Sequence, residues 1–459
     1  MCGIVGVYST NRAAELATLA LFAEQHRGQE SCGMAVSDGN KIKLRKKLGL
    51  VKNVFREKKL KKLTGRMAIG HVRYPTRGVT TENNSQPHVV ETLFGPSYAL
   101  VSNGDIVNYD EMRKKLEHEG VFFSSNNDGE LILRYLVYLI EIKKLNVIDA
   151  IKKIFHNIKG AYSTIFITKD NMYIFRDPHG FRPLCYGQNK KNITFIASES
   201  CALDILKSET IKEVKPAQII EIKSSQTQIY APDAQEFKKS SNYQHCIFEH
   251  IYFSRPDSKI FQEKVFEKRE KLGYLLAEND DIDADAVIPV PDSANFIALG
   301  YAKAKNIPFE MGLIRNHYVG RTFIKPEQTI RDESVSQKFN VLPEFFINKK
   351  IILIDDSIVR GTTVRKIVKL IKNAGAKEVH LRIGSPKVKF SCYYGIDTPT
   401  RNELIANRKS VAEINQYVNA DSLKFLTVNE TKKIVDNPDD YCFACFNGKY
   451  PLKKENHDN

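Results

Sequence analysis

Apolar residues in the first half of the chain follow two periods. Short runs of alternating apolar and polar residues predict strands, and stretches with an apolar residue every three or four positions predict helices. The expected strands are 68–72, 98–101, 162–167, 172–175 and 219–222, and the expected helices are 13–24, 109–119, 129–142 and 147–155. Strands grouped around helices in this way predict a layered α+β domain.

The second half alternates differently. Fully apolar runs separated by helical stretches predict a parallel, doubly wound α/β sheet. Its expected strands are 286–290, 351–354 and 378–383, and its expected helices are 295–305 and 363–374.

Two polar segments interrupt these patterns. The segment 224–241, which carries Pro232, is the predicted linker between the halves. The stretch from about residue 320 to residue 340 has little apolar periodicity and is too long for an ordinary connection. We therefore expect it to be an active-site lid.

Composition bounds the class of protein. With 459 residues, 42% of them hydrophobic, the chain is long enough for two or three domains with buried cores. The longest apolar helical run, 131–142, is interrupted by Arg134 and is too short to cross a bilayer. No charged and then apolar leader opens the chain, so we expect a cytoplasmic protein that does not bind a membrane.

The chain carries a formal net charge of +15, which suggests polyanionic partners. Many lysines lie in clusters typical of solvated surfaces, such as 45–47 and 58–62. Because neither interleaved aromatic residues nor a nucleic-acid-binding module accompanies them, we do not expect nucleic acid as a partner.

Cys2 follows the initiator methionine. Once Met1 is removed, Cys2 carries a thiol and a free α-amine, which titrate at about 8.5 and about 7.7–8.0, so the amine can accept the thiol proton. The apolar run after it predicts a buried strand that holds this end in place. An accidental cysteine at a disordered end is the alternative, and this segment alone does not separate the two. With no propeptide before Cys2, we expect maturation to need only the removal of Met1.

The segment 351–363, Ile-Ile-Leu-Ile-Asp-Asp-Ser-Ile-Val-Arg-Gly-Thr-Thr, is the strongest single signal. An apolar strand ends in Asp355 and Asp356, and a Gly-Thr-Thr turn then opens a helix. Backbone N–H groups and hydroxyls at a helix start suit a phosphate, and paired carboxylates suit ribose hydroxyls or Mg²⁺. A helix cap with a solvated charge is the alternative, but it does not account for the whole segment.

This segment resembles the phosphoribosylpyrophosphate-binding signature of type I phosphoribosyltransferases. The resemblance implies that the Val-Pro-Asp-Ser sequence at 290–293 forms the pyrophosphate-side loop, with Ser293 joining Asp355 and Asp356 around one Mg²⁺. It implies further substrate contacts by Arg321 in the expected lid and by Arg360, Gly361, Thr362 and Thr363.

With the Cys2 terminus, further motifs make the chain similar to the amidophosphoribosyltransferase family as far as Pro451. They are 25–31 (Gln-His-Arg-Gly-Gln-Glu-Ser), 70–74, 102–104, 176–184, 197–200 and 252–258. The resemblance implies an N-terminal-nucleophile hydrolase sandwich (αββα) over 1–235. It implies an α/β type I phosphoribosyltransferase domain with a parallel sheet and a C-terminal cluster-binding segment over 236–459.

The resemblance also implies the activity of the family. Glutamine is hydrolysed at Cys2, and the ammonia displaces pyrophosphate from 5-phosphoribosyl 1-pyrophosphate to give 5-phosphoribosylamine, the first step of purine (IMP) biosynthesis. The Asn103 side chain and the Gly104 N–H would form the oxyanion hole. Arg73 would hold the α-carboxylate of glutamine, and Asp128 its α-ammonium.

Two histidines in these motifs are also candidate bases. We expect His71 and His179 to be structural, because the α-amine of Cys2 already serves as the base.

Cys442 and Cys445 have the spacing of two metal ligands. By themselves they most often indicate two of the four ligands of a zinc site. The remaining cysteines of the second half are Cys246 and Cys392. The surroundings of all four resemble the iron–sulfur branch of the family, which implies one [4Fe–4S] cluster per subunit, structural or oxygen-sensing. A zinc ion is the alternative, because four thiolates suit either metal.

The family also implies a homotetramer and feedback inhibition by purine nucleotides. The chain departs from the family pattern at Gly129 (usually Ser or Thr), Cys32 (usually Ala), His317 (usually Arg) and Ser336-Gln337 beside Lys338. The changes near the lid put its phosphate contacts in question.

Two rival functions differ in class or substrate. A ligand-sensing regulator with a phosphoribosyltransferase fold has only the positive charge in its favour, and the glutamine-site motifs argue against it. A sugar-phosphate aminase with the same Cys2 terminus does not account for Asp355-Asp356.

Overall fold

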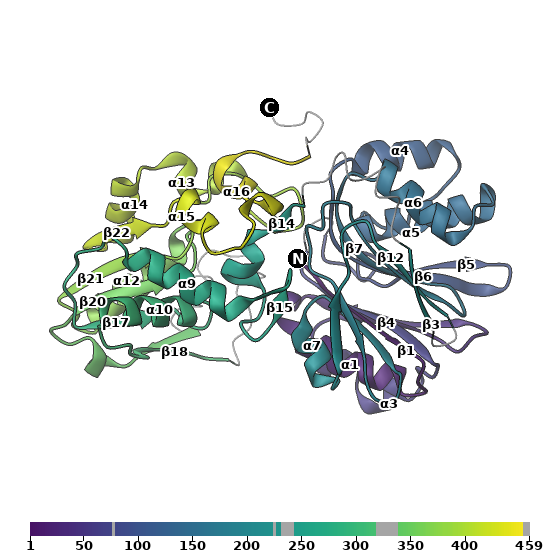
Figure 1. Cartoon of the computed structure of the whole chain (residues 1–459), viewed down its shortest axis with the longest axis horizontal. Coiled ribbons are helices and arrows are strands. Elements are labelled where there is room, and N and C mark those ends of the chain that lie inside the picture. Colours follow the sequence, from purple (N-terminus) through teal and green to yellow (C-terminus); the bar gives the residue numbers. More distant parts are fainter. Residues whose placement is uncertain (76–78, 224–225, 231–242, 318–337, 453–459) are drawn as a thin grey trace.

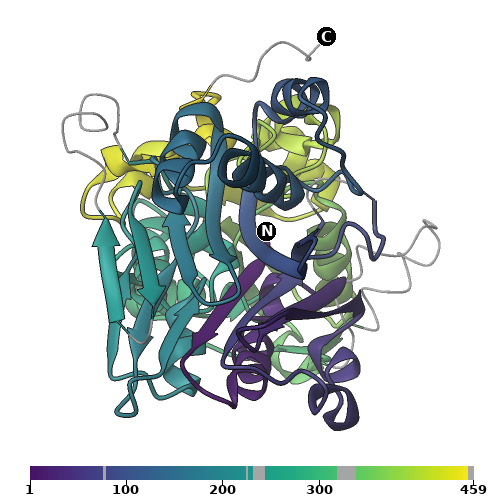
Figure 2. The same cartoon turned by 90° about the vertical axis from the view of Figure 1, so that its right-hand side faces the viewer.

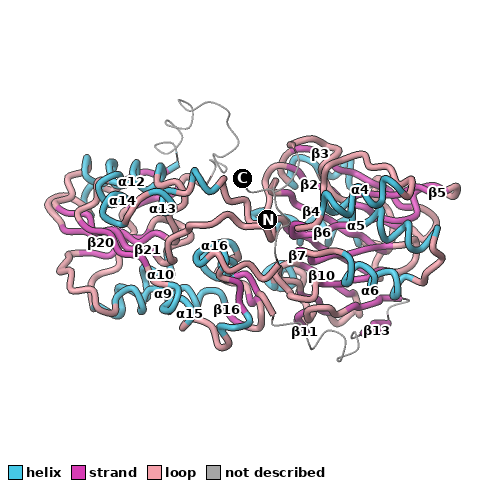
Figure 3. The backbone as a smooth tube through the Cα atoms, turned by 90° about the horizontal axis from the view of Figure 1, so that it is seen from above, coloured by secondary structure: helices cyan, strands magenta, loops and turns pink. Residues whose placement is uncertain are grey.

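The computed structural model describes residues 1–75, 79–223, 226–230, 243–317 and 338–452. The two halves of the chain form two bodies side by side, and the N-terminus lies where they meet (Figure 1). The view from above shows the same position of the N-terminus, and the C-terminal helix α16 (Ala444–Asn447) lies in the same region (Figure 3).

The first half contains two antiparallel sheets (Figure 2). One sheet has the order β11-β9-β10-β1-β4-β2-β3 and the other β13-β12-β8-β7-β6-β5. The strands of the first are β1 (Gly3–Tyr8), β2 (Ser31–Ser37), β3 (Ile42–Leu48), β4 (Met67–Arg73), β9 (Cys185–Gln188), β10 (Thr194–Ala197) and β11 (Thr210–Glu213). Those of the second are β5 (His88–Thr92), β6 (Gly95–Ile106), β7 (Gly160–Ile167), β8 (Met172–Arg176), β12 (Ile219–Lys223) and β13 (Gln226–Tyr230).

The two sheets pack face to face. Buried residues from both, among them Ile4, Ile69, Val101 and Ile165, form one apolar cluster between them. The first sheet packs outside against α1 (Ala13–Ala23) and α7 (Ser200–Ile205), and the second against α4 (Tyr109–His118), α5 (Asp128–Val137) and α6 (Val147–Asn157). The layers are therefore αββα, which confirms the predicted sandwich.

The predicted helix at 129–142 is in fact two segments. Helix α5 begins at Asp128, where the Asn127 side chain accepts from the Gly129 N–H at 2.9 Å as an N-cap. The chain continues as a π-helical turn, η2 (Tyr138–Ile142).

The sheet of the second half is wholly parallel, with the order β17-β20-β21-β22. Its strands are β17 (Ala286–Pro289), β20 (Lys350–Asp355), β21 (Glu378–Ile383) and β22 (Ser422–Phe425). Helices α9 (Val265–Ala277) and α10 (Asn295–Lys305) share one apolar cluster with the sheet, and α12 (Thr362–Asn373) and α14 (Val411–Val418) share another. Burial on both faces explains the continuous apolar runs, and the parallel sheet predicted for this half is confirmed.

The remaining elements are short. They are α2 (Val51–Val54), α3 (Glu57–Leu60), α13 (Ile405–Arg408), α15 (Val428–Lys432), β14 (His245–Cys246), β15 (Lys259–Ile260), β16 (Glu263–Lys264), β18 (Leu313–Arg315), β19 (Phe339–Val341), β23 (Tyr441–Cys442), η1 (Gln25–Arg27), η3 (Glu249–Phe253), η5 (Pro343–Phe345), η6 (Arg401–Glu403) and η7 (Pro438–Asp440). Within the described ranges, no helix combines the length and the apolar character needed to span a membrane.

The predicted linker is wrong in part. Residues 226–230 form β13, which pairs along its length with β12. It is an edge strand with polar, mostly exposed residues, so it lacks the alternation that marks a half-buried strand. The predicted domain boundary, between residues 235 and 236, lies outside the described residues, as does most of the predicted lid.

Candidate functional site

Cys2 lies directly before β1 and is almost fully buried, with 7% of its surface exposed. Its N–H donates to Asn103 Oδ1 at 3.0 Å, and its thiol donates to the Tyr74 carbonyl at 3.5 Å. Arg27 Nε donates to the Cys2 carbonyl at 2.9 Å. The sheet therefore holds the predicted nucleophile in a fixed position beside Asn103.

Charges around Cys2 come from the residues predicted to bind glutamine. Burial raises the pKa of the Cys2 thiol, while the terminal amine and Arg73 lower it and Asp128 raises it. Burial also lowers the pKa of the terminal amine, which belongs to Met1 here, to about 6. At this pKa the Met1 amine is mostly unprotonated at neutral pH.

Asn103 lies near the carboxyl end of β6 and is fully buried. Its Oδ1 accepts from Cys2, but its Nδ2 has no hydrogen-bond partner among the described residues. Such an orphan donor is costly and calls for an explanation, and a substrate oxygen beside the thiol supplies one. At Gly104, a Cβ would lie 1.8 Å from the Ala161 carbonyl, so only glycine fits there.

Arg73 ends β4 and is 1% exposed. Its Nη1 donates to Glu30 Oε1 at 3.0 Å and to the Val79 carbonyl at 3.5 Å. Asp128, the first residue of α5, is also buried, and its Oδ1 accepts from the Gly129 N–H at 3.0 Å. The charges of both residues act on the Cys2 thiol, so the structure brings a guanidinium group and a carboxylate near it.

Sequence reasoning missed Gln86, which is buried beside Ser102 and Asn127. Its Oε1 accepts from the Ser102 N–H at 2.7 Å, and its Nε2 donates to the Ser102 carbonyl and to Asn127 Oδ1, each at 3.1 Å. Gln86 therefore joins the strand of Asn103 to the turn of Asp128. A Cβ at Gly129 would lie 2.9 Å from the Gln86 amide, which relates the departure at Gly129 to this packing. No periodicity marks Gln86 in the sequence.

The two candidate histidines differ in their surroundings. His71 is fully buried in β4, and burial together with the charge of Arg73 lowers its pKa well below the usual value. His179 is half-buried in the turn after β8, with its ring 5.6 Å from that of Phe181. Neither observation assigns a catalytic role to these side chains.

The second candidate site lies at the carboxyl end of β20. Asp355 and Asp356 are buried there, and Ser293 Oγ and Ser357 Oγ donate to the two oxygens of Asp356 at 2.7 and 2.6 Å. Burial raises the pKa of both carboxyl groups, and the charge of Asp356 raises that of Asp355 further. Two buried carboxyl groups whose ionisation is penalised by burial, and for Asp355 also by the charge of its neighbour, fit a divalent cation, which would relieve these penalties.

A turn follows these acids and opens α12. Gly361 adopts a left-handed conformation (φ +77°) at the N-cap, and Thr362 and Thr363 are exposed in the first turn. N–H groups at the first turn of a helix have no partner within the helix, so this end can bind an anion. The Arg360 guanidinium pairs with Glu403 at 2.9 Å.

The loop predicted to lie on the pyrophosphate side contacts the chain just before the predicted lid. Asp292 accepts from Arg315 Nη1 at 2.8 Å, and His317 Nδ1 lies 4.0 Å from the same carboxylate. Arg321 and Ser336-Gln337 lie outside the described residues.

Comparisons with known proteins place two family models on this chain. The family model described as "Glutamine amidotransferase domain" matches residues 71–204, and "Phosphoribosyl transferase domain" matches 262–383. The chloroplastic amidophosphoribosyltransferase of Vigna aconitifolia is 45% identical over 99% of this chain and 92% of its own length.

The chain belongs to the amidophosphoribosyltransferase family.

Other members of the family are similarly close. The amidophosphoribosyltransferase of Methanocaldococcus jannaschii is 44% identical over 99% of this chain and 98% of its own. A solved structure of B. subtilis glutamine phosphoribosylpyrophosphate amidotransferase, "complexed with ADP and GMP", is 38% identical, with a TM-score of 0.90 over 99% of this chain and 98% of that one.

The four cysteines of the phosphoribosyltransferase half of this family member gather at its C-terminal segment. Cys246 and Cys442 are paired neighbours on β14 and β23, and the Cys445 carbonyl accepts from Lys389 and Phe390, close to Cys392. Burial raises the pKa of the Cys445 thiol, and the charges of the other three raise it further. In the part of the chain that the structure describes, no three His, Cys, Asp or Glu side chains stand so that they could hold a metal ion.

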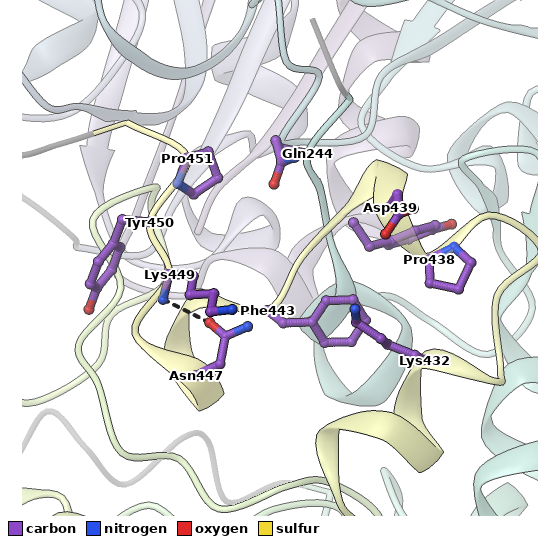
Figure 4. Close-up of a pocket in the computed structure, with 10 residues that line it drawn as sticks. Gln244, Lys432, Pro438, Asp439, Phe443, Asn447, Lys449, Tyr450 and Pro451 are labelled. Carbon is purple, nitrogen blue, oxygen red and sulfur yellow. Dashed lines mark hydrogen bonds between the residues drawn. The ribbon is translucent and has the colours of Figure 1, made fainter.

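A shallow cavity of about 290 Å³ opens beside this cysteine segment (Figure 4). Gln244, Phe443 and Lys449 are among its lining residues, and Asn447 Oδ1 accepts from the Lys449 N–H at 2.8 Å. No residue predicted for either candidate site lines it, so we assign it no part in the family's reaction.

Proposed function

We propose that this family member makes 5-phosphoribosylamine from glutamine and 5-phosphoribosyl 1-pyrophosphate, at two sites joined by internal transfer of ammonia. The observation that carries this proposal is the buried Asn103 Nδ2, which has no partner among the described residues and belongs to a side chain whose Oδ1 accepts from the Cys2 N–H. A site for glutamine amide chemistry needs a donor at that place. We assign the glutaminase to residues 1–235 and the phosphoribosyltransferase to 236–459.

In the first half-reaction, the Cys2 thiol loses its proton to the α-amine and attacks the side-chain carbonyl of glutamine. A thioester forms and ammonia leaves; water then hydrolyses the thioester. Asn103 Nδ2 and the Gly104 N–H would donate to the developing oxyanion, and each such donor contributes about 2.7–4 kcal/mol in comparable sites. Arg73 would bind the α-carboxylate and Asp128 the α-ammonium, which selects glutamine over other amides.

In the second half-reaction, ammonia attacks C1 of the ribose and pyrophosphate leaves. Ser293, Asp355 and Asp356 would hold one Mg²⁺, whose charge neutralises that of the pyrophosphate. Gly361, Thr362 and Thr363 would bind the 5-phosphate. Arg360 would have to leave its ion pair with Glu403 to contact the substrate. Arg321, in the predicted lid, would also contact the substrate. No protein nucleophile is needed, because positioning and charge neutralisation suffice.

We propose that Cys246, Cys392, Cys442 and Cys445 hold one [4Fe–4S] cluster, with zinc as the alternative. A zinc ion needs its four sulfurs within about 2.3 Å of one point. The charges of Cys246, Cys392 and Cys442 act on the Cys445 thiol, so the four cysteines lie in one region. Their sequence surroundings, which resemble the iron–sulfur branch of the family, are the reason to prefer the cluster. Anaerobically purified protein should contain about four iron and four sulfide per chain. Colourless protein with stoichiometric zinc would contradict the cluster.

The remaining assignments concern partners. We propose purine nucleotides as feedback inhibitors, since the B. subtilis relative was solved with ADP and GMP.

We also propose a cytoplasmic homotetramer that binds neither membrane nor nucleic acid, although several plant relatives are chloroplastic. Light scattering with and without ADP and GMP would test the assembly, and inhibition curves would test the regulation.

The decisive experiment separates the two nitrogen sources. Cys2→Ala should lower the glutamine-dependent reaction by more than about 10³-fold, because the nucleophile is lost, and should leave the ammonia-dependent reaction within about twofold of wild type. Loss of both reactions in a folded variant would mean that the halves are misassigned. Protein that retains Met1 should behave like Cys2→Ala.

A further inference from the structure

A buried carboxylate of the second half lies behind the glutaminase nucleophile. Glu249, in η3, is wholly buried. Its Oε1 accepts from Arg27 Nη2 at 2.9 Å and its Oε2 from Arg27 Nη1 at 3.1 Å. Arg182 Nη1 lies 3.5 Å from Oε1, and Ser254 Oγ donates to Oε2 at 2.6 Å. Both arginines belong to the first half, so Glu249 connects the two halves.

The contact reaches the nucleophile through Arg27. While two nitrogens of this guanidinium group face Glu249, its Nε donates to the Cys2 carbonyl at 2.9 Å. Arg27 Nη1 also contacts Glu199 of the first half. Because the guanidinium group is planar and rigid, fixing one edge on Glu249 fixes the direction of the other donor. The position of Cys2 therefore depends on a residue 247 positions later in the chain.

A second contact from the same half reaches the oxyanion strand. Gly395 adopts a left-handed conformation (φ +101°), and a Cβ there would lie 2.9–3.1 Å from the backbone atoms of Gly104. The preceding Tyr394 carbonyl accepts from Arg182 Nε at 2.8 Å, and the Tyr394 ring stacks on Phe181 with centroids 4.3 Å apart. Residues 394–395 thus lie directly against the backbone that would offer the Gly104 N–H.

We propose that Glu249 and Gly395 are positioning residues of the glutaminase, so that the second half of the chain completes the geometry of the first site. The proposal rests on the roles proposed above for Cys2 and Gly104. Attack on an amide requires the thiol and the oxyanion donors to be correctly placed relative to each other. A misplacement of about 1 Å can lower the rate roughly 100-fold. Glu249 acts through Arg27, and Gly395 acts by direct packing.

Stability alone is a weak reason for this arrangement. Buried ion pairs lose much of their attraction to desolvation, and apolar replacements are often at least as stable. A buried carboxylate that holds two arginines of the other half is better explained by the geometry it imposes. Arg182 belongs to both contacts, because it meets Glu249 and the Tyr394 carbonyl.

The test compares four full-length variants, of which Glu249→Asp serves as the conservative change. Glu249→Gln keeps the shape of the side chain and removes its charge, and Gly395→Ala adds one methyl group against Gly104. Glu267→Gln, on the exposed side of α9 where Glu267 pairs with Lys264, is the matched control. For each variant we would measure glutamine hydrolysis, ammonia-dependent synthesis, and the rate at which 6-diazo-5-oxonorleucine, a reactive glutamine analogue, labels Cys2.

Both test variants should lower kcat for glutamine hydrolysis by roughly 10- to 100-fold, with KM for glutamine changed less than about threefold. Labelling of Cys2 should slow by the same factor. Ammonia-dependent synthesis should stay within about twofold of wild type, as should every activity of Glu267→Gln. Glu249→Asp, which keeps the charge at a shorter reach, should recover part of the lost kcat.

Two results would overturn the proposal. One is unchanged kcat and labelling in both Glu249→Gln and Gly395→Ala. The other is an equal loss of the two reactions in Glu249→Asp and Gly395→Ala, since that would place the effect on folding. A wild-type enzyme that makes 5-phosphoribosylamine from ammonia but hydrolyses no glutamine would contradict the proposed role of Cys2 instead.

Discussion

The two candidate sites differ in how far their groups are exposed. In the candidate glutaminase site, Arg73 and Asn103 are buried on strands and Cys2 is buried directly before β1, and hydrogen bonds hold all three before any substrate is present. In the candidate phosphoribosyl site, Asp355 and Asp356 are buried, but Thr362 and Thr363 are exposed at a helix start.

The comparison suggests two ways of stabilising charge during a reaction. Buried donors that are fixed in advance need no reorganisation when charge develops, which suits an oxyanion formed within the protein. A substrate that carries several phosphates brings its own charge and can order exposed groups around a cation. The first site should therefore be sensitive to small changes of shape, and the second to changes of charge.

The largest effect should come from removing charge at the second site. Asp356→Asn should lower 5-phosphoribosylamine synthesis from both glutamine and ammonia by about 10³-fold, because a ligand of the proposed Mg²⁺ is lost. Glutamine hydrolysis should persist. Asp110→Asn, an exposed change on α4, is the control. Synthesis that is unaffected at saturating Mg²⁺ would refute the role of the acid pair.

A change of shape in the first site should come next. Asn103→Ala should lower kcat for glutamine hydrolysis by about 10²- to 10³-fold, because the removal of one oxyanion donor has this effect in comparable sites. Steady-state assays with glutamine and with ammonia would separate this loss from any damage to the second site. If the two reactions declined together, Asn103 would be structural.

Arg73→Lys should have a smaller effect, on binding. Lysine keeps the charge but lacks the planar fork that can hold a carboxylate at two points. We expect KM for glutamine to rise by roughly 10- to 100-fold with kcat little changed, since each lost hydrogen bond to a charged group costs about 1.5–3 kcal/mol. A fall in kcat at constant KM would instead point to a role in orienting Cys2.

The smallest expected effect concerns pH and stability. Burial and the charge of Lys46 lower the pKa of His88 to about 3, and its Nε2 lies 3.1 Å from Asn127 Oδ1 in the glutamine turn. The native state therefore keeps His88 neutral, whereas the unfolded chain protonates it below about pH 6.5. Stability should fall as pH drops from about 6.5 toward 3, by up to about 1.4 kcal/mol per pH unit from this group.

His88→Gln removes the titrating group. Urea unfolding of the two proteins at pH 5 and pH 7 should show a shallower pH dependence for the variant. Parallel slopes would mean that His88 is already neutral in the unfolded chain or protonated in the folded protein.

Local patterns in the sequence were enough for most of the framework. Helix α10 spans the residues predicted for it, and β21 does too, because each carries an apolar face or run that a fixed partner covers. The edge strand β13 was missed because its residues are polar and exposed, so that its backbone pairing with β12 leaves no pattern in side-chain polarity.

Residues that position others were harder to find. Cys2 and the acids of the phosphate turn belong to compact motifs whose chemistry is visible in the sequence. Gln86 and Glu249 act only through partners brought near by folding, and Glu249 lies 222 positions from Arg27. Their side chains are ordinary in their local sequence. Only the tertiary structure shows what they hold.

The buried charges at the junction also bear on how such a chain can evolve. A glutaminase half separated from its partner would leave Arg27 and Arg182 without the carboxylate of Glu249, and it would lose the turn at Gly395 that packs on its active-site strand. The halves are therefore poor candidates for exchange between distant proteins, even though each has its own fold. We expect compensating changes on the two sides of this junction to be inherited together, so that the chain behaves as one gene product and not as two modules in tandem.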